Sequence, residues 1–526
     1  MLYPVEEFTD DERALLAPHF TNLDRPVFAI VNLPETVKGA LFARYSRYRG
    51  TLRRLFLDEF AEAARPGGAA FEEDEGERAR GLYERIFLGY GDDSVAQLGG
   101  AHIACEWASN LLTKILQRPR LGAYLEQSTR YIPYDAESEP LGYRFYRDAA
   151  FGPEYERAMT GLFETYSEGL SRVSAWVESE YPRADDEAPA AHARAVRAKA
   201  LDLVRGILPA SSLSHVGIYA TGQTYEQLLL HLFAHPLSEA RDYGRMMLEE
   251  LQKVMPSFVV RVDRPDRGGR WIEYLRDRER RARELAERLG LREAEQESAA
   301  SVRLLRVEGG EEELAAASLF EHSTLSERDA AAAVERLSPD ERAEVIAWLA
   351  GERENRRHRP GRGFEAVRYR FEIVADYGAF RDLQRHRLLT AQWQPLTPEL
   401  GADIPHEVEL AGYGDEFAAA VESSEDEYVR LRDAGFADEA AYALCLAFRI
   451  RFVLDLNARE AMHLIELRSG REGHPSYRAV AHEMHRLIAE VHPAIARAMT
   501  FVDESTEPRL ERLLSEIRNQ ARATSS

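Results

Sequence analysis

The feature that most constrains the fold of this chain is an internal repeat. Residues 116–121 read LQRPRL and residues 383–388 read LQRHRL, so five of six positions are identical at an offset of 267 residues (385 minus 118). A second similarity follows in the same order, because residues 205–232 resemble residues 441–468, and each is an apolar segment that leads into an amphipathic helix. Two matches in the same order predict a tandem duplication.

The length of 526 residues accommodates two such copies. We expect an N-terminal copy over 1–263, a helical linker over 264–301 and a C-terminal copy over 302–526. The linker is dense in Arg and Glu at helical spacing, which predicts an exposed helix with i,i+4 ion pairs. A solvated linker is favoured over a helix that binds a partner.

The pattern of the remaining chain predicts a helix-rich α+β fold. Residues 367–376, VRYRFEIVAD, alternate like a half-buried strand, and VRLLRVEGG at 302–310 predicts a strand and a turn. Cys105 and Cys445 both lie in apolar surroundings that suggest helices. Helical segments are expected at 38–64, 155–181, 224–255, 311–352 and 438–500.

Composition and charge exclude several classes of function. Asp plus Glu is 90 and Lys plus Arg is 68, a net charge of −22, so no nucleic-acid partner is expected. Two cysteines exclude a disulfide framework and a cysteine-based zinc site, and they fit a reducing cytosol. The N-terminus lacks the pattern of a signal peptide, and no apolar run approaches membrane-spanning length. We therefore expect a soluble, cytoplasmic protein without a membrane partner.

The Arg385-His386-Arg387 cluster is the first candidate binding site. It has no evident packing role inside its periodic apolar segment, and guanidinium groups offer paired donors in a plane that suit a phosphate. The alternative is a surface cluster of ion pairs with nearby glutamates. A metal site is not expected, because His482 and His485 are one residue short of the spacing in a His-Glu-x-x-His zinc motif.

Together, the motifs of the two halves resemble the flavin-dependent thymidylate synthases. In that family Arg-His-Arg is followed, after seven residues, by Ser-x-Arg-Tyr; the first half has Arg118-Pro119-Arg120 and then Ser128-Thr129-Arg130-Tyr131. GYGDDSVAQ at 89–97 is similar to the family's Gly-His-x-Ser-x-x-Glu segment, with Ser94 in register. Arg205 opens RGILP, like the family's Arg-x-x-Leu-Pro.

The second half carries the complementary set of motifs. It has the intact Arg-His-Arg, and Asn457, Arg459, His463 and Arg468 follow the family's Asn-x-Arg-x3-His-x4-Arg spacing. Pro395 replaces the downstream serine, just as proline replaces the histidine in the first half. Each half keeps what the other lost. The resemblance therefore implies two copies of the family fold, a composite site, and a homodimer that imitates the family's tetramer.

The resemblance also implies the reaction, which is FAD-dependent methylation of dUMP to dTMP with methylenetetrahydrofolate and NADPH as co-substrates. Two of the residues are implied to be catalytic: Arg468 beside the uracil ring oxygen, and Ser128 as a ligand-binding hydroxyl. The residues implied to bind the flavin are Ser94, Arg385, His386, Arg387, Asn457, Arg459 and His463. Those implied to bind the nucleotide are Glu126, Gln127, Ser128, Thr129, Arg130, Arg205 and Arg468.

Each of these motifs also has a plainer structural interpretation. The helix residues can serve as a cap and in surface pairs, residues 126–130 can form a polar turn, and Arg205 can form a structural salt bridge. Asp382 stands where the family has a glutamine that contacts the nucleotide, and the equivalent position in the first half is Ile115. This loss leaves a second hypothesis open, that of a non-catalytic flavin- or nucleotide-binding paralogue.

Overall fold

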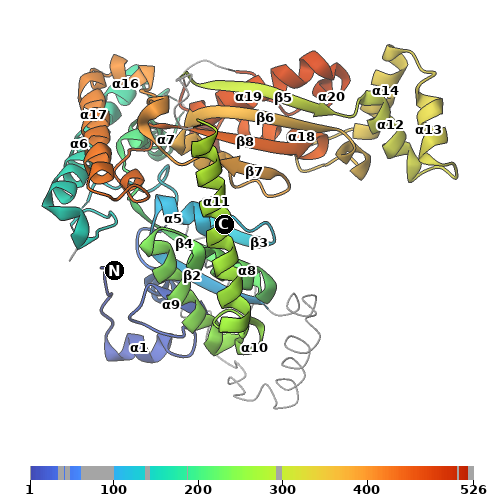
Figure 1. Ribbon diagram of the computed structural model, residues 1–526. Helices are drawn as coiled ribbons and strands as arrows, with labels where there is room; N and C mark the ends of the chain where they lie inside the picture. Colours follow the sequence, from blue (N-terminus) through green and yellow to red (C-terminus); the bar gives the residue numbers. More distant parts are fainter. Residues whose placement is uncertain are drawn as a thin grey trace. The chain divides into compact units, whose positions relative to one another are not determined.

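The structure is a computed structural model. It describes residues 2–33, 41, 45, 48–60, 100–136, 142–185, 187–291, 299–505 and 509–518. Segment 89–97, with the predicted flavin ligand Ser94, lies outside these residues, as does much of the helical segment expected at 38–64. The described part contains two small antiparallel sheets and many helices (Figure 1), which confirms the helix-rich α+β class.

The two sheets share one topology, with four antiparallel strands in equivalent order. The order is β1-β2-β4-β3 in the first sheet and β5-β6-β8-β7 in the second. In both, the strand third in sequence pairs at the edge, beside the fourth. This equivalence supports the predicted duplication. The strands are β1 (Val27–Ile30), β2 (Gly100–Ser109), β3 (Gly122–Glu126), β4 (Leu213–Thr221), β5 (Ser301–Glu308), β6 (Arg368–Asp376), β7 (Thr390–Trp393) and β8 (Arg449–Asn457).

Helices cover the sheets, with α8 and α9 against the first and α18 and α19 against the second. No helix in the described ranges is both long and apolar enough to span a membrane. The helices of the first half are α1 (Asp10–Leu16), α3 (Leu52–Leu55), α5 (Asn110–Leu116), α6 (Gly152–Glu180), α7 (Pro189–Val204), α8 (Gly222–Ala234), α9 (Ser238–Val254), α10 (Pro256–Val259) and α11 (Arg270–Arg288). Those of the second half are α12 (Glu311–Phe320), α13 (Glu327–Val334), α14 (Pro339–Ala350), α15 (Tyr377–Leu383), α16 (His406–Leu410), α17 (Gly414–Asp433), α18 (Ala458–Arg468), α19 (Pro475–Val491) and α20 (Pro493–Arg497).

Equivalent caps position the arginine motifs in both halves. Ser109 ends β2 and its side chain accepts from the backbone N–H of Leu112, while Asp376 ends β6 and accepts from the N–H of Ala379. These caps start the seven-residue helices α5 and α15, and each arginine motif follows directly after its helix. The caps therefore fix where each arginine motif begins relative to its sheet.

Two of the sequence-based assignments need correction. The helical segment predicted at 438–500 was wrong over Arg449–Asn457, which forms strand β8, because Ile450, Phe452, Leu454 and Leu456 alternate as buried residues with period two. Cys105 lies in strand β2 and Cys445 in the segment before β8, so neither is in a helix; both are buried, and neither forms a disulfide. The strands predicted at 302–310 and 367–376 and the exposed linker helix, α11, are confirmed.

The chain divides into two compact units, and each contains segments from both sequence copies. The first unit comprises Met1–Ser167, Leu208–Glu295 and Glu422–Leu444, and the second comprises Glu168–Ile207, Gln296–Val421 and Cys445–Ser526. In the first unit the N–H of Ala210 donates to the carbonyl of Leu444 at 2.7 Å; in the second the N–H of Ala447 donates to the carbonyl of Gly206 at 3.0 Å. The copies predicted at 1–263 and 302–526 thus describe the sequence repeat. In the folded chain, each compact unit also contains a segment from the other copy.

A buried carboxyl shows this exchange in the first unit. Glu239 on α9 accepts from the Ser109 hydroxyl at 2.6 Å and from the Tyr442 hydroxyl, contributed by the second copy, at 2.7 Å. Burial raises the pKa of Glu239 to about 7, since desolvation outweighs these hydrogen bonds. The ordinary value of 4.5 applies in the unfolded chain, so the folded state binds this proton more tightly between about pH 4.5 and 7.

Glu239 is therefore predicted to make the free energy of unfolding fall as the pH rises from about 4.5 to 7. The stabilising contribution is fully present below the unfolded pKa and is lost through the folded pKa, a change of up to about 3 kcal/mol. Urea unfolding at pH 5 and pH 7.5 should show a smaller pH dependence for Glu239→Gln than for the wild type. Glu249→Gln, an exposed change on the same helix, serves as the control. An equal pH dependence in Glu239→Gln and the wild type would contradict the assignment.

Candidate functional site

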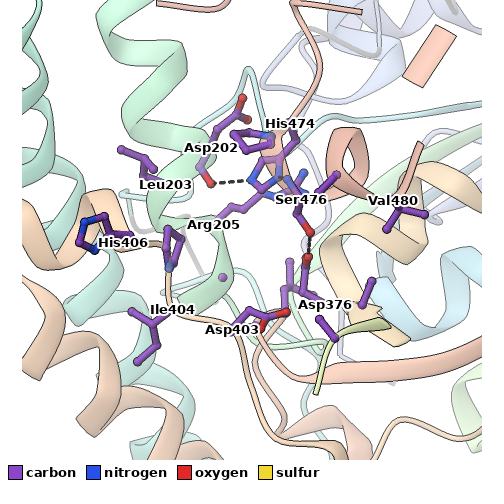
Figure 2. A pocket seen from close by; sticks show the side chains of 18 of the residues that line it. Asp202, Leu203, Arg205, Asp376, Asp403, Ile404, His406, His474, Ser476 and Val480 are labelled. Carbon is purple, nitrogen blue, oxygen red and sulfur yellow. Dashed lines mark hydrogen bonds between the residues drawn. The ribbon is translucent and has the colours of Figure 1, made fainter. Parts of the chain in front are cut away.

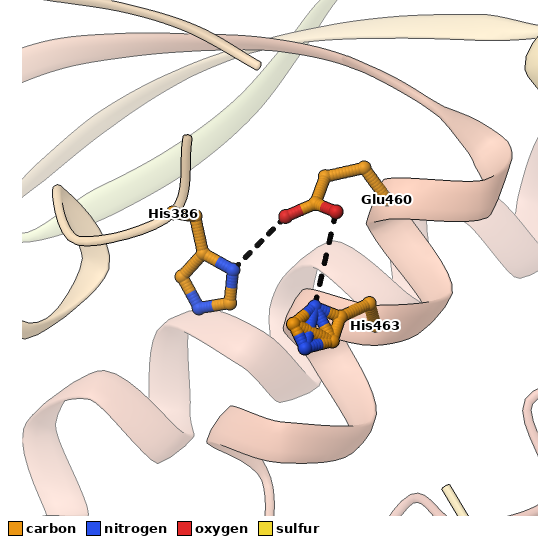
Figure 3. A group of neighbouring side chains, drawn as sticks. All are labelled: His386, Glu460 and His463. Atoms are coloured by element: carbon orange, nitrogen blue, oxygen red, sulfur yellow. Dashed lines mark hydrogen bonds and ion pairs between the residues drawn. The ribbon is translucent and has the colours of Figure 1, made fainter. Parts of the chain in front are cut away.

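The Arg-His-Arg segment of the second unit is anchored through its histidine. His386 is buried; its Nδ1 lies 3.1 Å from Oε1 of Glu460, and its Nε2 accepts from Nε of Arg468 at 3.0 Å (Figure 3 shows the pairing with Glu460). An arginine can only donate, so Nε2 carries the lone pair and Nδ1 carries the hydrogen. Burial lowers the pKa of His386 well below its ordinary value, and Arg468 adds to the shift. A neutral imidazole in one fixed tautomer thus connects Glu460 to Arg468.

His463 lies one helical turn beyond Glu460, on the same face of α18. Its Nδ1 lies 3.8 Å from Oε2 of Glu460, a charge contact drawn in Figure 3, and makes no hydrogen bond within the part of the chain that the structure describes. Burial, aided by Arg359 and other arginines, lowers the pKa of His463 to about 4. Burial raises the pKa of Glu460 to about 7, against the opposing effect of Arg359 and Arg459. The cluster therefore offers one open imidazole nitrogen in strongly positive surroundings.

His386, Glu460 and His463 are also residue types that bind metal ions, and their ligand atoms lie within 4.8 Å of one another. The electrostatics around them oppose a cation, because burial, and after it the nearby arginines, lower the pKa values of both histidines. Both nitrogens of His386 are already engaged. The donor set suits an anionic ligand or a polar ring edge better than a metal ion.

Asp382 joins an arginine from the first copy to one from the second. Nη1 of Arg205 donates to Oδ2 of Asp382 at 3.3 Å, and Nη1 of Arg385 lies 3.5 Å from Oδ1. All three belong to the second unit, although Arg205 precedes Asp382 by 177 residues. Asp382 also attracts the charge of Arg468, whose pKa is lowered by burial. Residues from both copies thus meet within one compact unit, which we term the arginine cluster: Arg205, Asp382, Arg385, His386 and Arg468.

A cavity of about 640 Å³ lies beside Arg205 within the second unit, with mainly apolar walls (Figure 2). Its size is typical of sites for small molecules and cofactors. Arg205 is 4% exposed, and its Nη2 has no hydrogen-bond partner among the described residues. Asp376, also in the wall, accepts from the hydroxyl of Ser476. The lining residues are Lys199, Asp202, Leu203, Arg205, Gly206, Ala300, Ser301, Val302, Val374, Ala375, Asp376, Asp403, Ile404, Pro405, His406, Glu407, Leu446, Ala447, His474, Pro475, Ser476, Ala479, Val480, Glu483 and Glu511.

Most acidic groups of the cavity wall pair with a cation other than Arg205. Asp202 pairs with Arg512 at 3.0 Å, and Glu407 and Glu511 each lie 2.8 Å from Nζ of Lys199. In the same way, Asp403 binds Arg449 and Glu483 binds Arg486. Asp376 is different, because its charge interacts with Arg205. The Nη2 of Arg205 makes no hydrogen bond within the described residues, so it can donate to an acceptor atom of a ligand.

The plainer interpretations describe several contacts of the second-half motif. The side chain of Asn457 caps α18 by accepting from the N–H of Glu460 at 2.9 Å. Nε of Arg459 donates to the carbonyl of Pro360 at 2.9 Å, and its Nη1 lies 3.4 Å from Glu365. Arg387 is partly buried and follows His386 in the chain. These contacts leave the implied flavin roles of Asn457, Arg459 and Arg387 as predictions.

Arg468 is the last residue of α18, where a cation interacts favourably with the helix C-terminus. The nearby Glu466 pairs with Arg353 at 2.5 Å. Besides bonding to His386, Arg468 lies over the ring of Tyr477, with its Cζ 5.4 Å from the centroid. Arg468 is thus fixed by an imidazole and an aromatic ring.

The polar segment predicted to bind the nucleotide phosphate, residues 126–130, lies in the first unit at the end of β3. Glu126 is buried against Lys114 at 2.7 Å and Gln117 at 2.9 Å. The Ser128 hydroxyl accepts from the N–H of Arg130 at 3.2 Å, which closes a turn. The other members, Gln127 and Thr129, are buried. The polar-turn interpretation describes this local geometry, and nucleotide binding by the segment stays a prediction.

Three residues of the site escaped the sequence analysis: Glu460, Arg359 and Asp376. The signal for Glu460 was present, because residues 457, 460 and 463 recur at three-residue intervals and so share one helical face. Arg359 belongs to an Arg-His-Arg sequence at 357–359 that the structure places in a loop, as its glycine- and proline-rich neighbourhood predicts. Its influence on Glu460 and His463 depends on tertiary packing and has no local signal.

The cap formed by Asn457 leads to a prediction about its contribution to stability. Asn457→Ala should lower the free energy of unfolding by about 1 kcal/mol, because an orphan helix N–H loses its acceptor. Asn457→Asp should keep stability within a few tenths of a kcal/mol, since aspartate caps equally well. Urea denaturation measures both values. Unchanged stability in Asn457→Ala would contradict the capping role.

Comparisons with known proteins give the family. The family model of the thymidylate synthase complementing protein matches two regions, residues 52–257 and 304–494. A "UPF0159 protein" of Chlamydia muridarum (strain MoPn / Nigg) is 37% identical over 535 residues, covering 99% of this chain and all of that protein. Another, of Thermoplasma acidophilum, is 32% identical over 518 residues, covering 92% of this chain and 99% of that protein.

Among solved structures, a crystal structure of a UMP/dUMP methylase from Streptomyces cacaoi bound with 5-Br dUMP matches at 22% identity. The match covers 39% of this chain and 97% of that chain, with a TM-score of 0.32. The two regions that match the family model fall within the two copies predicted from the sequence. The chain belongs to the thymidylate synthase complementing protein family, the flavin-dependent thymidylate synthases, as a member with two copies of the family domain.

Proposed function

We propose that this protein methylates dUMP to dTMP at a site to which both copies contribute. The methyl group replaces the hydrogen at C5 of the uracil; methylenetetrahydrofolate supplies its carbon and NADPH the reducing equivalents. Bound FAD would supply the hydride chemistry, which amino-acid side chains lack. The observation that carries the proposal is the meeting of first-copy Arg205 with second-copy Asp382, Arg385, His386 and Arg468 in one unit.

The donor set supports binding of a flavin by the second copy. Arg385, Arg387 and Arg459 provide guanidinium groups for a phosphate or for ring oxygens. The open Nδ1 of His463 adds one further polar contact in an otherwise buried setting. The positive surroundings that depress the pKa of His463 also favour an anionic cofactor.

The nucleotide is proposed to lie between the cavity and the arginine cluster. Nη2 of Arg205 provides a donor toward a phosphate oxygen or a carbonyl oxygen, and the apolar walls exclude water. Arg468, fixed by His386 and Tyr477, would stabilise negative charge on the uracil oxygen. Independently of this geometry, the resemblance to the family assigns a phosphate contact to Ser128. A homodimer would then carry half the number of sites expected of a four-subunit relative.

A second candidate function is a flavin- or nucleotide-binding protein without catalytic activity. The observation that favours it is Asp382, which stands in place of the family's glutamine and already occupies Arg205 and Arg385. The complementary retention of motifs favours the enzyme. The two hypotheses differ in whether bound flavin is accompanied by exchange of the C5 hydrogen of dUMP.

The purified protein is therefore expected to show a flavin absorbance band and, with reduced FAD and methylenetetrahydrofolate, to release tritium from [5-³H]dUMP. Absence of both signals would exclude the synthase. A flavin band without tritium release would establish the binding protein instead.

A narrower prediction concerns the two copies separately. Arg385→Ala should weaken flavin retention, and Ser128→Ala should raise the KM for dUMP, each by roughly 10- to 100-fold, because each removes one hydrogen bond to a charged group. Arg357→Ala, in the exposed loop that carries the second Arg-His-Arg sequence, is the matched control and should leave both unchanged. If only one of the two test variants has an effect, the site does not draw on both copies.

A further inference from the structure

Asp382 is a buried carboxylate in a position where a ligand anion would otherwise be expected. It is 8% exposed, and its two oxygens face two guanidinium groups, at 3.3 Å from Arg205 and 3.5 Å from Arg385. The carboxylate also attracts a third guanidinium group, that of Arg468. Arginine forks bind carboxylates and phosphates with similar planar geometry. Asp382 thus satisfies the same donors that would hold a phosphate monoester.

The contact differs from an ordinary structural salt bridge in how it uses Arg205. Asp382 accepts from Nη1, while the buried Nη2 beside the cavity makes no hydrogen bond in the described part of the chain. Gly378 keeps the space next to this group open, because a Cβ there would lie 3.0 Å from Nη2 of Arg205 and 2.8 Å from Oδ1 of Asp376. A salt bridge that served stability alone would gain from using both amines of Arg205.

The guanidinium groups that would hold the phosphate lie among carboxylates. Arg205 and Arg385 contribute two positive charges, Asp382 lies against both, and Asp376 adds a negative charge that interacts with Arg205. Asp382 repels any phosphate that approaches the same guanidinium groups. Asp382 therefore weakens binding of the phosphate without abolishing it.

We propose that Asp382 is a specificity-determining residue, an internal carboxylate that competes with the ligand phosphate for Arg205 and Arg385. The cluster then binds inorganic phosphate poorly by itself, and a nucleotide binds well only through the additional contacts of its base and sugar. The identity of the nucleotide in this inference rests on the proposed function. The competition between Asp382 and a phosphate does not.

The test is isothermal titration calorimetry of the full-length protein with sodium phosphate and, separately, with dUMP. Asp382→Asn removes the charge at nearly constant shape and should tighten the Kd for inorganic phosphate by roughly tenfold or more. Asp382→Gln, which restores the family's amide, should also tighten it. Asp455→Asn is the matched control, because Asp455 is likewise held by arginines, Arg306, Arg368 and Arg370, on the second sheet. It should change the Kd less than twofold.

Unchanged or weaker phosphate binding in both Asp382 variants would overturn the proposal, provided that their thermal unfolding shows folded protein. Equal tightening in Asp455→Asn would also overturn it, since the effect would then reflect overall charge. These outcomes are distinct from failure of the proposed function. If phosphate binding tightens but no tritium is released from dUMP, the competition by Asp382 is supported and the synthase is excluded. If tritium is released but phosphate binding is unchanged, the synthase is supported and the competition is excluded.

Discussion

The ion pair between Arg205 and Asp382 is the contact on which the candidate site depends. It joins a segment of the first copy to the arginine-bearing loop of the second, inside one compact unit. The pair is buried, so its geometry is held by packing as well as by charge. Asp382 also lies 3.5 Å from Arg385 and attracts the charge of Arg468, so this one carboxylate links the arginines of the cluster.

The duplication explains how such a contact arose within a single chain. Two sheets with equivalent strand order carry equivalent capped helices, and each unit includes a segment from the other copy. In the first unit Tyr442 of the second copy donates to the buried Glu239, and in the second unit Arg205 of the first copy donates to Asp382. A tandem fusion frees each copy to lose one half of a composite site, provided that the other copy keeps it. The pattern of lost and kept motif residues has this form.

The sequence sufficed for the repeat and the fold class, because these rest on motif spacing and hydrophobic period. Strands β5 and β6 were predictable from the alternation of apolar and polar residues. Strand β8 was missed because helical segments lie shortly before and directly after it. The bond from Arg468 to His386 and the influence of Arg359 on Glu460 were not predictable, since they join positions distant in sequence. Asp382 was recognisable as a departure from the family, but its partners were visible only in three dimensions.

The most direct test is a titration of dUMP into the flavin-loaded protein, followed through the change in flavin absorbance. If the site is built from both copies, Arg205→Ala in the first copy and Arg468→Ala in the second should each raise the half-saturating dUMP concentration by at least about tenfold. This is the change expected for loss of a hydrogen bond to a charged group. If Arg205→Ala binds dUMP as the wild type does while Arg468→Ala does not, the nucleotide site belongs to the second copy alone.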